Sequence, residues 1–155
     1  MRTAVKLFKK LKEKSLQIVF AESCTAGLVA DALACVPGAS SVLWGSYVTY
    51  TNDAKQTMLK IKPELLAEHG AVSSECACAM ACSALKESGA SIAVSVTGLA
   101  GPSGDGSNPV GTVWIGCASL DEKKTTQAFL FKGSRPAIRR KAVQAALQIA
   151  IENSN

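Results

Sequence analysis

The sequence predicts an α/β fold, namely a three-layer α/β/α sandwich around a mixed β-sheet. Short apolar runs with strand character alternate with longer segments of helical periodicity, which is typical of helices that cover both faces of a sheet. The last two predicted strands, residues 112–119 and 125–132, are joined only through residues 120–123. So short a connection predicts an antiparallel pair, because a parallel crossover needs about a dozen residues or more.

The chain has 155 residues, of which 48% are hydrophobic and 19% are charged. This predicts one globular domain over residues 1–155, without an internal repeat or linker. The apolar runs are far shorter than the roughly 20 residues of a membrane span, so no membrane contact is expected. The basic N-terminus lacks a cleavage site of small residues, which predicts a helix rather than a signal peptide and a cytoplasmic protein.

The first three elements follow from periodicity and from helix breakers. Residues 2–14 place apolar side chains on one helix face and lysines around it. Residues 16–21 are almost continuously apolar, as in a buried strand. Residues 25–36 predict a helix that Pro37 and Gly38 end.

A second strand and helix meet at a polar junction. Residues 42–51 (VLWGSYVTYT) are rich in β-branched and aromatic residues, which favour a strand. Residues 54–60 predict a helix, with Asn52 or Asp53 as the expected N-cap. Two further helices follow, over residues 64–69 and then over a cysteine-rich stretch.

Serine, proline and glycine signals bound the remaining elements. Pro63 predicts a helix start, and Ser73 or Ser74 is the expected cap of the cysteine-rich helix. Residues 91–96 predict a strand that leads into a glycine-rich loop. A closing helix is expected over residues 135–152.

The net charge of +5 comes from 17 Lys and Arg against 12 Asp and Glu, and much of it lies in residues 6–14 and 132–141. These patches lack interleaved aromatic residues and any nucleic-acid docking motif. We therefore do not expect nucleic acid as a partner, and an anionic small molecule explains a local basic site equally well.

The six cysteines do not have the spacing of a zinc site. Cys76, Cys78 and Cys82 form the only cluster, and His69 is the only histidine. Without a signal peptide, we expect the cysteines to be reduced and to pack as small core residues, with no bound metal.

Ser23 lies between a predicted buried strand and a predicted helix. In this position a serine either caps the helix or acts as a nucleophile beside free helix N–H groups. The surrounding residues do not form a G-x-S-x-G elbow, and His69 is the only histidine available for a triad. Both interpretations of Ser23 stay open from this stretch alone.

Lys55 and Tyr50 lie at the next strand-to-helix junction, where an α/β sheet collects active-site groups. A lysine whose pKa is lowered can activate a serine. The alternatives are a solvated helix lysine and a tyrosine ring packed on a strand. Likewise, the glycines after Thr97 form either an anion cradle or a flexible loop, and Arg135 and Arg139 either grip an anion or face solvent.

Six ordered motifs together resemble the CinA C-terminal domain family, whose stand-alone members are nicotinamide-nucleotide amidohydrolases. The resemblance covers roughly residues 5–152. The motifs are AESCTAG, YTNDAK, HGAVS, SVTGLAGP, PVGTVW and GSRPAIRR.

The resemblance implies hydrolysis of nicotinamide mononucleotide to nicotinic acid mononucleotide and ammonia, a step of pyridine nucleotide salvage. It places the nucleophile at Ser23, the base at Lys55 and an orienting or proton-passing group at Tyr50. No metal or organic cofactor is implied, and a homodimer or higher assembly is suggested. The residues expected to bind the substrate are Cys24, Thr25, Gly27, Thr97, Gly98, Gly101 and Arg139.

Two positions depart from the family pattern. Ala26 stands where the family usually has glycine, and Asp53 where glutamate is common. An alternative function is a non-catalytic module that binds a nucleotide or a partner linked to competence or DNA damage.

Overall fold

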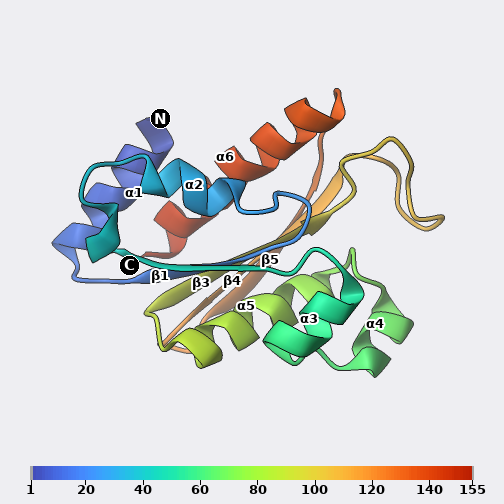
Figure 1. Cartoon of the computed structure of the whole chain (residues 1–155), viewed down its shortest axis with the longest axis horizontal. Coiled ribbons are helices and arrows are strands. Elements are labelled where there is room, and N and C mark those ends of the chain that lie inside the picture. The colour runs from blue at the N-terminus through green and yellow to red at the C-terminus, as the bar shows by residue number, and fades with distance from the viewer. Residues whose placement is uncertain (1, 155) are drawn as a thin grey trace.

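The computed structural model describes residues 2–154 as a mixed sheet between two layers of helices (Figure 1). The predicted order of elements and the three-layer sandwich are confirmed. The elements are α1 (Arg2–Glu13), β1 (Ile18–Glu22), α2 (Leu28–Ala34), the 3₁₀ helix η1 (Ala39–Ser41), β2 (Leu43–Val48), α3 (Asn52–Leu59), α4 (Pro63–His69), α5 (Ser74–Ser88), β3 (Ile92–Gly98), β4 (Thr112–Ser119), β5 (Lys124–Leu130) and α6 (Arg135–Asn153).

The five strands lie in the order β2-β1-β3-β4-β5. β1 is parallel to both β2 and β3, whereas β4 is antiparallel to both β3 and β5, so the predicted mixed sheet is confirmed. Helices α1, α2 and α6 cover one face, and α3, α4 and α5 cover the other (Figure 1). No helix within residues 2–154 is long and apolar enough to cross a bilayer.

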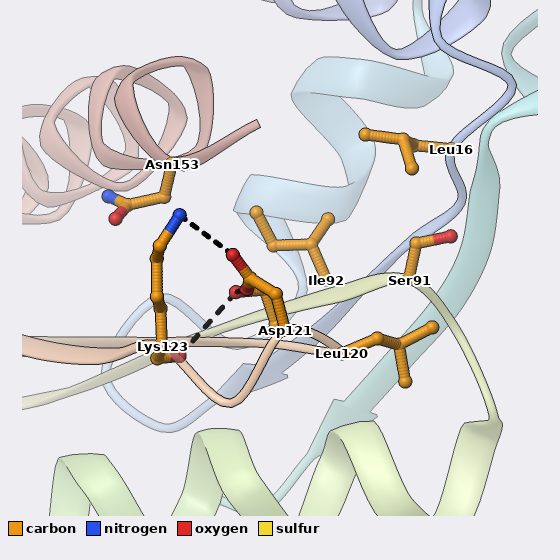
Figure 2. Close-up of a pocket in the computed structure, with 8 residues that line it drawn as sticks. Leu16, Ser91, Ile92, Leu120, Asp121, Lys123 and Asn153 are labelled. Atoms are coloured by element: carbon orange, nitrogen blue, oxygen red, sulfur yellow. Dashed lines mark hydrogen bonds and ion pairs between the residues drawn. The ribbon is translucent and has the colours of Figure 1, made fainter. Parts of the chain in front are cut away.

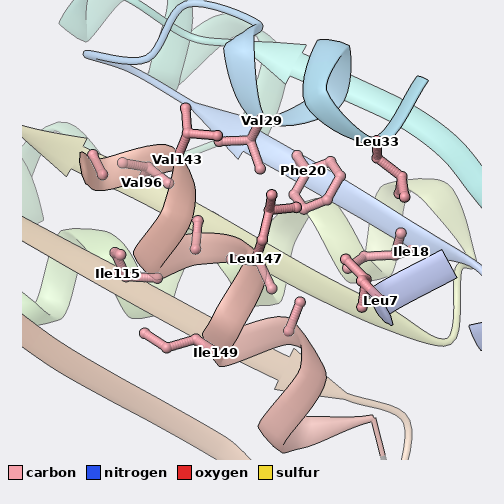
Figure 3. Close-up of a cluster of buried hydrophobic side chains, with 14 of the residues drawn as sticks. Leu7, Ile18, Phe20, Val29, Leu33, Val96, Ile115, Val143, Leu147 and Ile149 are labelled. Carbon is pink, nitrogen blue, oxygen red and sulfur yellow. The ribbon is translucent and has the colours of Figure 1, made fainter. Parts of the chain in front are cut away.

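The larger hydrophobic core lies under α1, α2 and α6 (Figure 3), and a smaller one lies under α3, α4 and α5. Successive residues of β1 point to opposite faces, so Phe20 joins the larger core and Ala21 the smaller one. The same alternation sends Glu22 toward α2 and Ser23 toward α3. The two faces thus receive different polar groups from adjacent residues.

The predicted helix over residues 25–36 is wrong at its start, because α2 begins only at Leu28. Ala26 and Gly27 have φ values of 51° and 94°, which are left-handed and cannot belong to a helix. Neither Ser23 nor Thr25 caps α2, whose N-cap position is Gly27 without a side-chain cap. Residues 23–27 therefore form a turn.

The expected cap of the helix after β2 is also wrong. The Thr51 hydroxyl, not Asn52 or Asp53, accepts the Ala54 N–H at 3.1 Å. β2 correspondingly ends at Val48, before the predicted strand end. In contrast, the Ser73 cap of α5 is confirmed by a 3.1 Å hydrogen bond from the Cys76 N–H.

Candidate active site

Ser23 follows the carboxyl end of β1, and its N–H donates to the Val96 carbonyl of β3 at 2.9 Å. This backbone bond fixes Ser23 at the edge where two neighbouring parallel strands end. Its side chain is almost fully buried and points to the α3 side of the sheet. Ser23 is therefore a fixed hydroxyl at the position where α/β sheets gather reactive groups.

Lys55 meets Ser23 inside the protein. The side chain is 2% exposed, and its Nζ lies 3.1 Å from Ser23 Oγ and 3.0 Å from the Thr49 carbonyl oxygen. Thr51 starts α3 so that Lys55 and Leu59, one turn apart, share its buried face. Lys55 is thus not a solvated helix lysine.

No carboxylate lies within ion-pair distance of Lys55 among residues 2–154. Burial lowers the pKa of its amine from the ordinary value of 10.5, and the neighbouring Cys76 and Cys24 oppose that shift only in part. A buried amine without a counter-charge favours the neutral form. Lys55 can then accept a proton from Ser23.

The Tyr50 hydroxyl points away from this pair. Its ring is 50% exposed, and its hydroxyl accepts a hydrogen bond from Arg135 Nη2 at 2.6 Å. Only the Tyr50 backbone carbonyl comes near Ser23 Oγ, at 3.5 Å. Tyr50 therefore lies at the wall of the site, and its hydroxyl is not in contact with the amine of Lys55.

A cavity of about 220 Å³ opens beside Ser23. Two positions in its wall require glycine. A Cβ on Gly98 would lie 2.7 Å from the Thr112 carbonyl oxygen, and Gly101 has a φ of 95°. The lining residues are Ser23, Cys24, Tyr50, Gly98, Leu99, Ala100, Gly101, Ser103 and Arg135. The glycine-rich segment after β3 is therefore one wall of the cavity.

Four residues expected to bind substrate lie outside the cavity lining: Thr25, Gly27, Thr97 and Arg139. Arg139 donates from Nε to the Cys24 carbonyl and from Nη2 to the Thr25 carbonyl, both at 2.9 Å. Thr97 Oγ1 donates to the Ala71 carbonyl at 2.7 Å. Arg139 and Thr97 therefore bind backbone carbonyls around the site and do not face the cavity.

Arg135 lines the cavity instead. It donates to the Gly101 carbonyl and to the Tyr50 hydroxyl, so it links the glycine-rich wall to the opposite wall. The sequence spacing placed Arg135 and Arg139 on one helix face, and the family resemblance selected Arg139 alone for substrate binding. Arg135 comes first in α6 and lies nearest the cavity, which the helix boundary alone does not reveal.

Glu22 is a functional support that the sequence did not indicate. It is fully buried, and its carboxylate accepts the N–H groups of Gly27, Val29 and Ala30, each at 3.0 Å. The N–H groups at the start of α2 are therefore already occupied by a carboxylate from the same chain. They are not available to an oxyanion.

Cys24 is the neighbouring alternative nucleophile. It is 6% exposed, and burial raises the pKa of its thiol to about 11, so little thiolate forms near neutral pH. Ser23, with an amine at 3.1 Å, has the better activating partner. No three His, Cys, Asp or Glu side chains within residues 2–154 are placed to hold a metal ion.

A second hollow of about 260 Å³ lies at the opposite end of β3 (Figure 2). Its main polar contact is an ion pair between Lys123 and Asp121 at 2.7 Å, and Asp121 also accepts from the Ser119 hydroxyl. The Asp121 carboxylate is paired with Lys123, and both side chains are more than half exposed, so no buried base activates the Ser119 hydroxyl here. The reactive pair and the cavity therefore coincide only at the Ser23 end.

The model of the CinA C-terminal domain family matches residues 2–153. The nicotinamide-nucleotide amidohydrolase PncC of Escherichia coli K12 is 40% identical over 149 residues, which cover 96% of this chain and 90% of that protein. A CinA-like protein of Geobacter sp. strain M21 is 44% identical over 83% of this chain, which spans only 31% of that longer protein.

Solved structures agree with the sequence comparisons. A CinA superfamily protein from Klebsiella pneumoniae has a TM-score of 0.95 at 31% identity, covering 99% of this chain and 96% of that one. A competence/damage inducible protein from Agrobacterium tumefaciens has a TM-score of 0.94 at 38% identity, covering 98% of this chain and 94% of that one.

Proposed function

This chain belongs to the CinA C-terminal domain family, and we propose that it hydrolyses the carboxamide of nicotinamide mononucleotide to nicotinic acid mononucleotide and ammonia. The observation that carries the proposal is the 3.1 Å contact between Ser23 Oγ and the buried Lys55 amine. Similarity over 90% of the length of the E. coli amidohydrolase supports the choice of substrate.

Lys55 acts as the base in the proposed first step. The neutral amine donates one hydrogen to the Thr49 carbonyl and accepts the Ser23 proton as Oγ attacks the amide carbon. The tetrahedral intermediate then breaks its C–N bond. The proton on Lys55 passes to the leaving nitrogen, so ammonia departs and an ester to Ser23 remains.

Water completes the cycle by attacking that ester while Lys55 accepts one of its protons. The new tetrahedral intermediate breaks the bond to Ser23 Oγ, which takes the proton back from Lys55. We assign oxyanion stabilisation to the backbone N–H of Cys24, which follows the nucleophile and lines the cavity. The start of α2 cannot serve, because Glu22 occupies its N–H groups.

We assign the substrate phosphate to Arg135 rather than to Arg139. Arg135 is an exposed guanidinium on the cavity wall, whereas Arg139 donates from Nε and Nη2 to the carbonyls of Cys24 and Thr25. Tyr50 then positions Arg135 through the 2.6 Å hydrogen bond. A planar guanidinium is well suited to grip a phosphate.

Ammonia release from nicotinamide mononucleotide tests the proposal directly. Ser23→Ala is expected to lower kcat by at least about 10³-fold, because no oxygen remains to form the ester. Cys24→Ala is the matched control and should retain most of the activity. Activity that survives in Ser23→Ala but disappears in Cys24→Ala would move the nucleophile to Cys24.

Tight binding of the mononucleotide without ammonia release would instead favour the non-catalytic module. The homodimer or higher assembly and the cytoplasmic location stay predictions.

A further inference from the structure

Helix α5 carries a second pair of reactive groups, away from the Ser23 cavity. Cys78 Sγ and Cys82 Sγ lie 4.0 Å apart, one helical turn from each other. Both side chains are half-buried, whereas Cys76 and Met80 on the other side of α5 are fully buried. Cys78 lines an open hollow of about 450 Å³ between α5 and β5, and the neighbouring Cys82 is itself partly exposed.

We propose that Cys78 and Cys82 form a two-thiolate binding site for a soft, thiophilic monovalent cation of the Cu(I) type. The site is independent of the proposed hydrolysis. Its nearest surroundings come from α5 and β5, where the hydroxyl groups of Ser74 and Thr126 lie 2.7 Å apart. The positive charge of Lys124 in β5 favours the thiolate form of Cys82.

The separation of the two sulfur atoms fits a bridging metal ion. An ion about 2.3 Å from each sulfur, the usual length of a metal–thiolate bond, spans the 4.0 Å gap with an S–metal–S angle of about 120°. A rotation of either side chain opens this angle further toward linear. The helix backbone can therefore stay as it is when the ion binds.

A disulfide does not fit the same pair. Positions i and i+4 of a helix have Cβ atoms about 5–6 Å apart, whereas a disulfide requires about 3.5–4.5 Å. Oxidation to a disulfide would therefore have to unwind part of α5, which is anchored by its Ser73 cap and by packing on β3 and β4. The geometry favours coordination over oxidation.

The number of ligands selects the metal. No third His, Cys, Asp or Glu joins a metal-binding group anywhere in residues 2–154, so the protein supplies two thiolates. Zinc in proteins prefers four ligands, whereas Cu(I) accepts two or three soft ones. A low-coordinate soft cation is therefore the class that this pair suits.

Binding exchanges protons for the metal. Each sulfur loses its proton and forms one bond to the ion, so two protons are released and no electron is transferred. Burial and the neighbouring Cys78 raise the pKa of the Cys82 thiol, and Lys124 partly offsets that shift. Binding should therefore release protons to solution, which pH-stat titration during Cu(I) addition can count.

Titration of the whole chain with Cu(I) under anaerobic conditions, against a chromophoric Cu(I) chelator, tests the proposal. We expect one tightly bound Cu(I) per chain and a loss of at least about 100-fold in affinity in Cys78→Ser and in Cys82→Ser. Cys35→Ser, at an exposed cysteine on the other side of the sheet, is the control and should bind as the unaltered chain does.

Alkylation of the unaltered chain gives a second measurement that does not depend on folding of the variants. Cu(I) should protect Cys78 and Cys82 from iodoacetamide, and peptide mass mapping should find that protection at no other cysteine. Unchanged affinity in both serine variants would overturn the site. Zn²⁺ binding as tight as that of Cu(I), or ready formation of a Cys78–Cys82 disulfide with the helix intact, would overturn the assigned coordination.

Discussion

Glu22 and Lys55 are both buried ionisable residues, yet they are held in very different ways on opposite faces of the sheet. Glu22 accepts four hydrogen bonds, three from the start of α2 and one from the Ser46 hydroxyl. Lys55 has two contacts, one with Ser23 and one with the Thr49 carbonyl. A fully satisfied carboxylate stabilises structure, whereas a poorly compensated amine is reactive.

Both residues contact the turn at residues 23–27, since Glu22 accepts the Gly27 N–H and the Lys55 amine lies 3.1 Å from Ser23 Oγ. Glu22 anchors the turn through Gly27, and Arg139 holds it through the carbonyls of Cys24 and Thr25. These contacts hold Ser23 in place. None of them brings a carboxylate within ion-pair distance of Lys55. Burial thus has different results on the two faces: Glu22, with four hydrogen bonds, supports the turn, whereas Lys55 has a lowered pKa and is the residue to which we assign proton transfer.

Replacement of the Lys55 amine is expected to have the largest effect of the changes that separate Lys55 from Glu22. Lys55→Met keeps the length of the side chain but removes the base, so ammonia release should fall by about 10²–10⁴-fold. The free energy of unfolding should not fall, because the buried amine has no counter-charge to lose. Urea denaturation beside the activity assay measures both, with Lys86→Met at an exposed position of α5 as the control.

The pH dependence of both quantities follows from the lowered pKa of Lys55. Activity should rise with pH through that lowered pKa, because only the neutral amine accepts a proton. Between the lowered pKa and 10.5 the unfolded chain binds a proton at Lys55 that the native chain does not. The free energy of unfolding should therefore rise with pH in this window, and a rise that persists unchanged in Lys55→Met would contradict the assignment.

Replacement of the carboxylate should have the opposite result. Glu22→Gln puts an amide donor where two acceptor oxygens now meet three N–H groups and a hydroxyl, leaving buried donors unpaired. The free energy of unfolding should fall by about 2–4 kcal/mol in urea titrations. Glu13→Gln, at an exposed end of α1, should change it little. A loss no larger than that of the control would show that Glu22 does not anchor α2.

The smallest effect concerns the turn between the two faces. Ala26 is exposed with a φ of 51°, a conformation that glycine adopts without strain. Ala26→Gly should raise the free energy of unfolding by about 0.5–1 kcal/mol and leave activity unchanged, because Ala26 does not line the cavity. Ala32→Gly, inside α2, should instead lower stability by about 1 kcal/mol. Loss of activity in Ala26→Gly would mean that the methyl group helps to shape the site.

The Ala26 geometry also shows what the departure from the family pattern costs. A left-handed φ is the reason that glycine suits this position, and the methyl group of Ala26 points to solvent rather than into the cavity. The departure is therefore a local backbone strain next to the nucleophile. It does not narrow the approach to Ser23.

The sequence by itself determined the order of the elements, the sandwich and the mixed sheet. Helical and strand periodicities are local, and the short link between β4 and β5 allows only an antiparallel pair. Ser23 and Lys55 could be singled out because both stand at strand-to-helix junctions of that pattern. The first residues of α2 and α3 could not be predicted from the sequence. They depend on the left-handed backbone of Ala26 and on the hydrogen bond from the Ala54 N–H to the Thr51 hydroxyl, which composition does not reveal.

Only the tertiary structure decided how these groups meet. The parallel pairing of β1 with β2 and β3 brings Ser23 beside Lys55 and beside the loop after Gly98, although they are far apart along the chain. Three further features depend on long-range contacts. They are the burial of Lys55, the hydrogen bond between Arg135 and the Tyr50 hydroxyl, and the hydrogen bonds from Arg139 to the carbonyls of Cys24 and Thr25. A side chain's environment is a sum over neighbours that sequence spacing does not specify, and here that environment lowers the pKa of a lysine beside a serine hydroxyl.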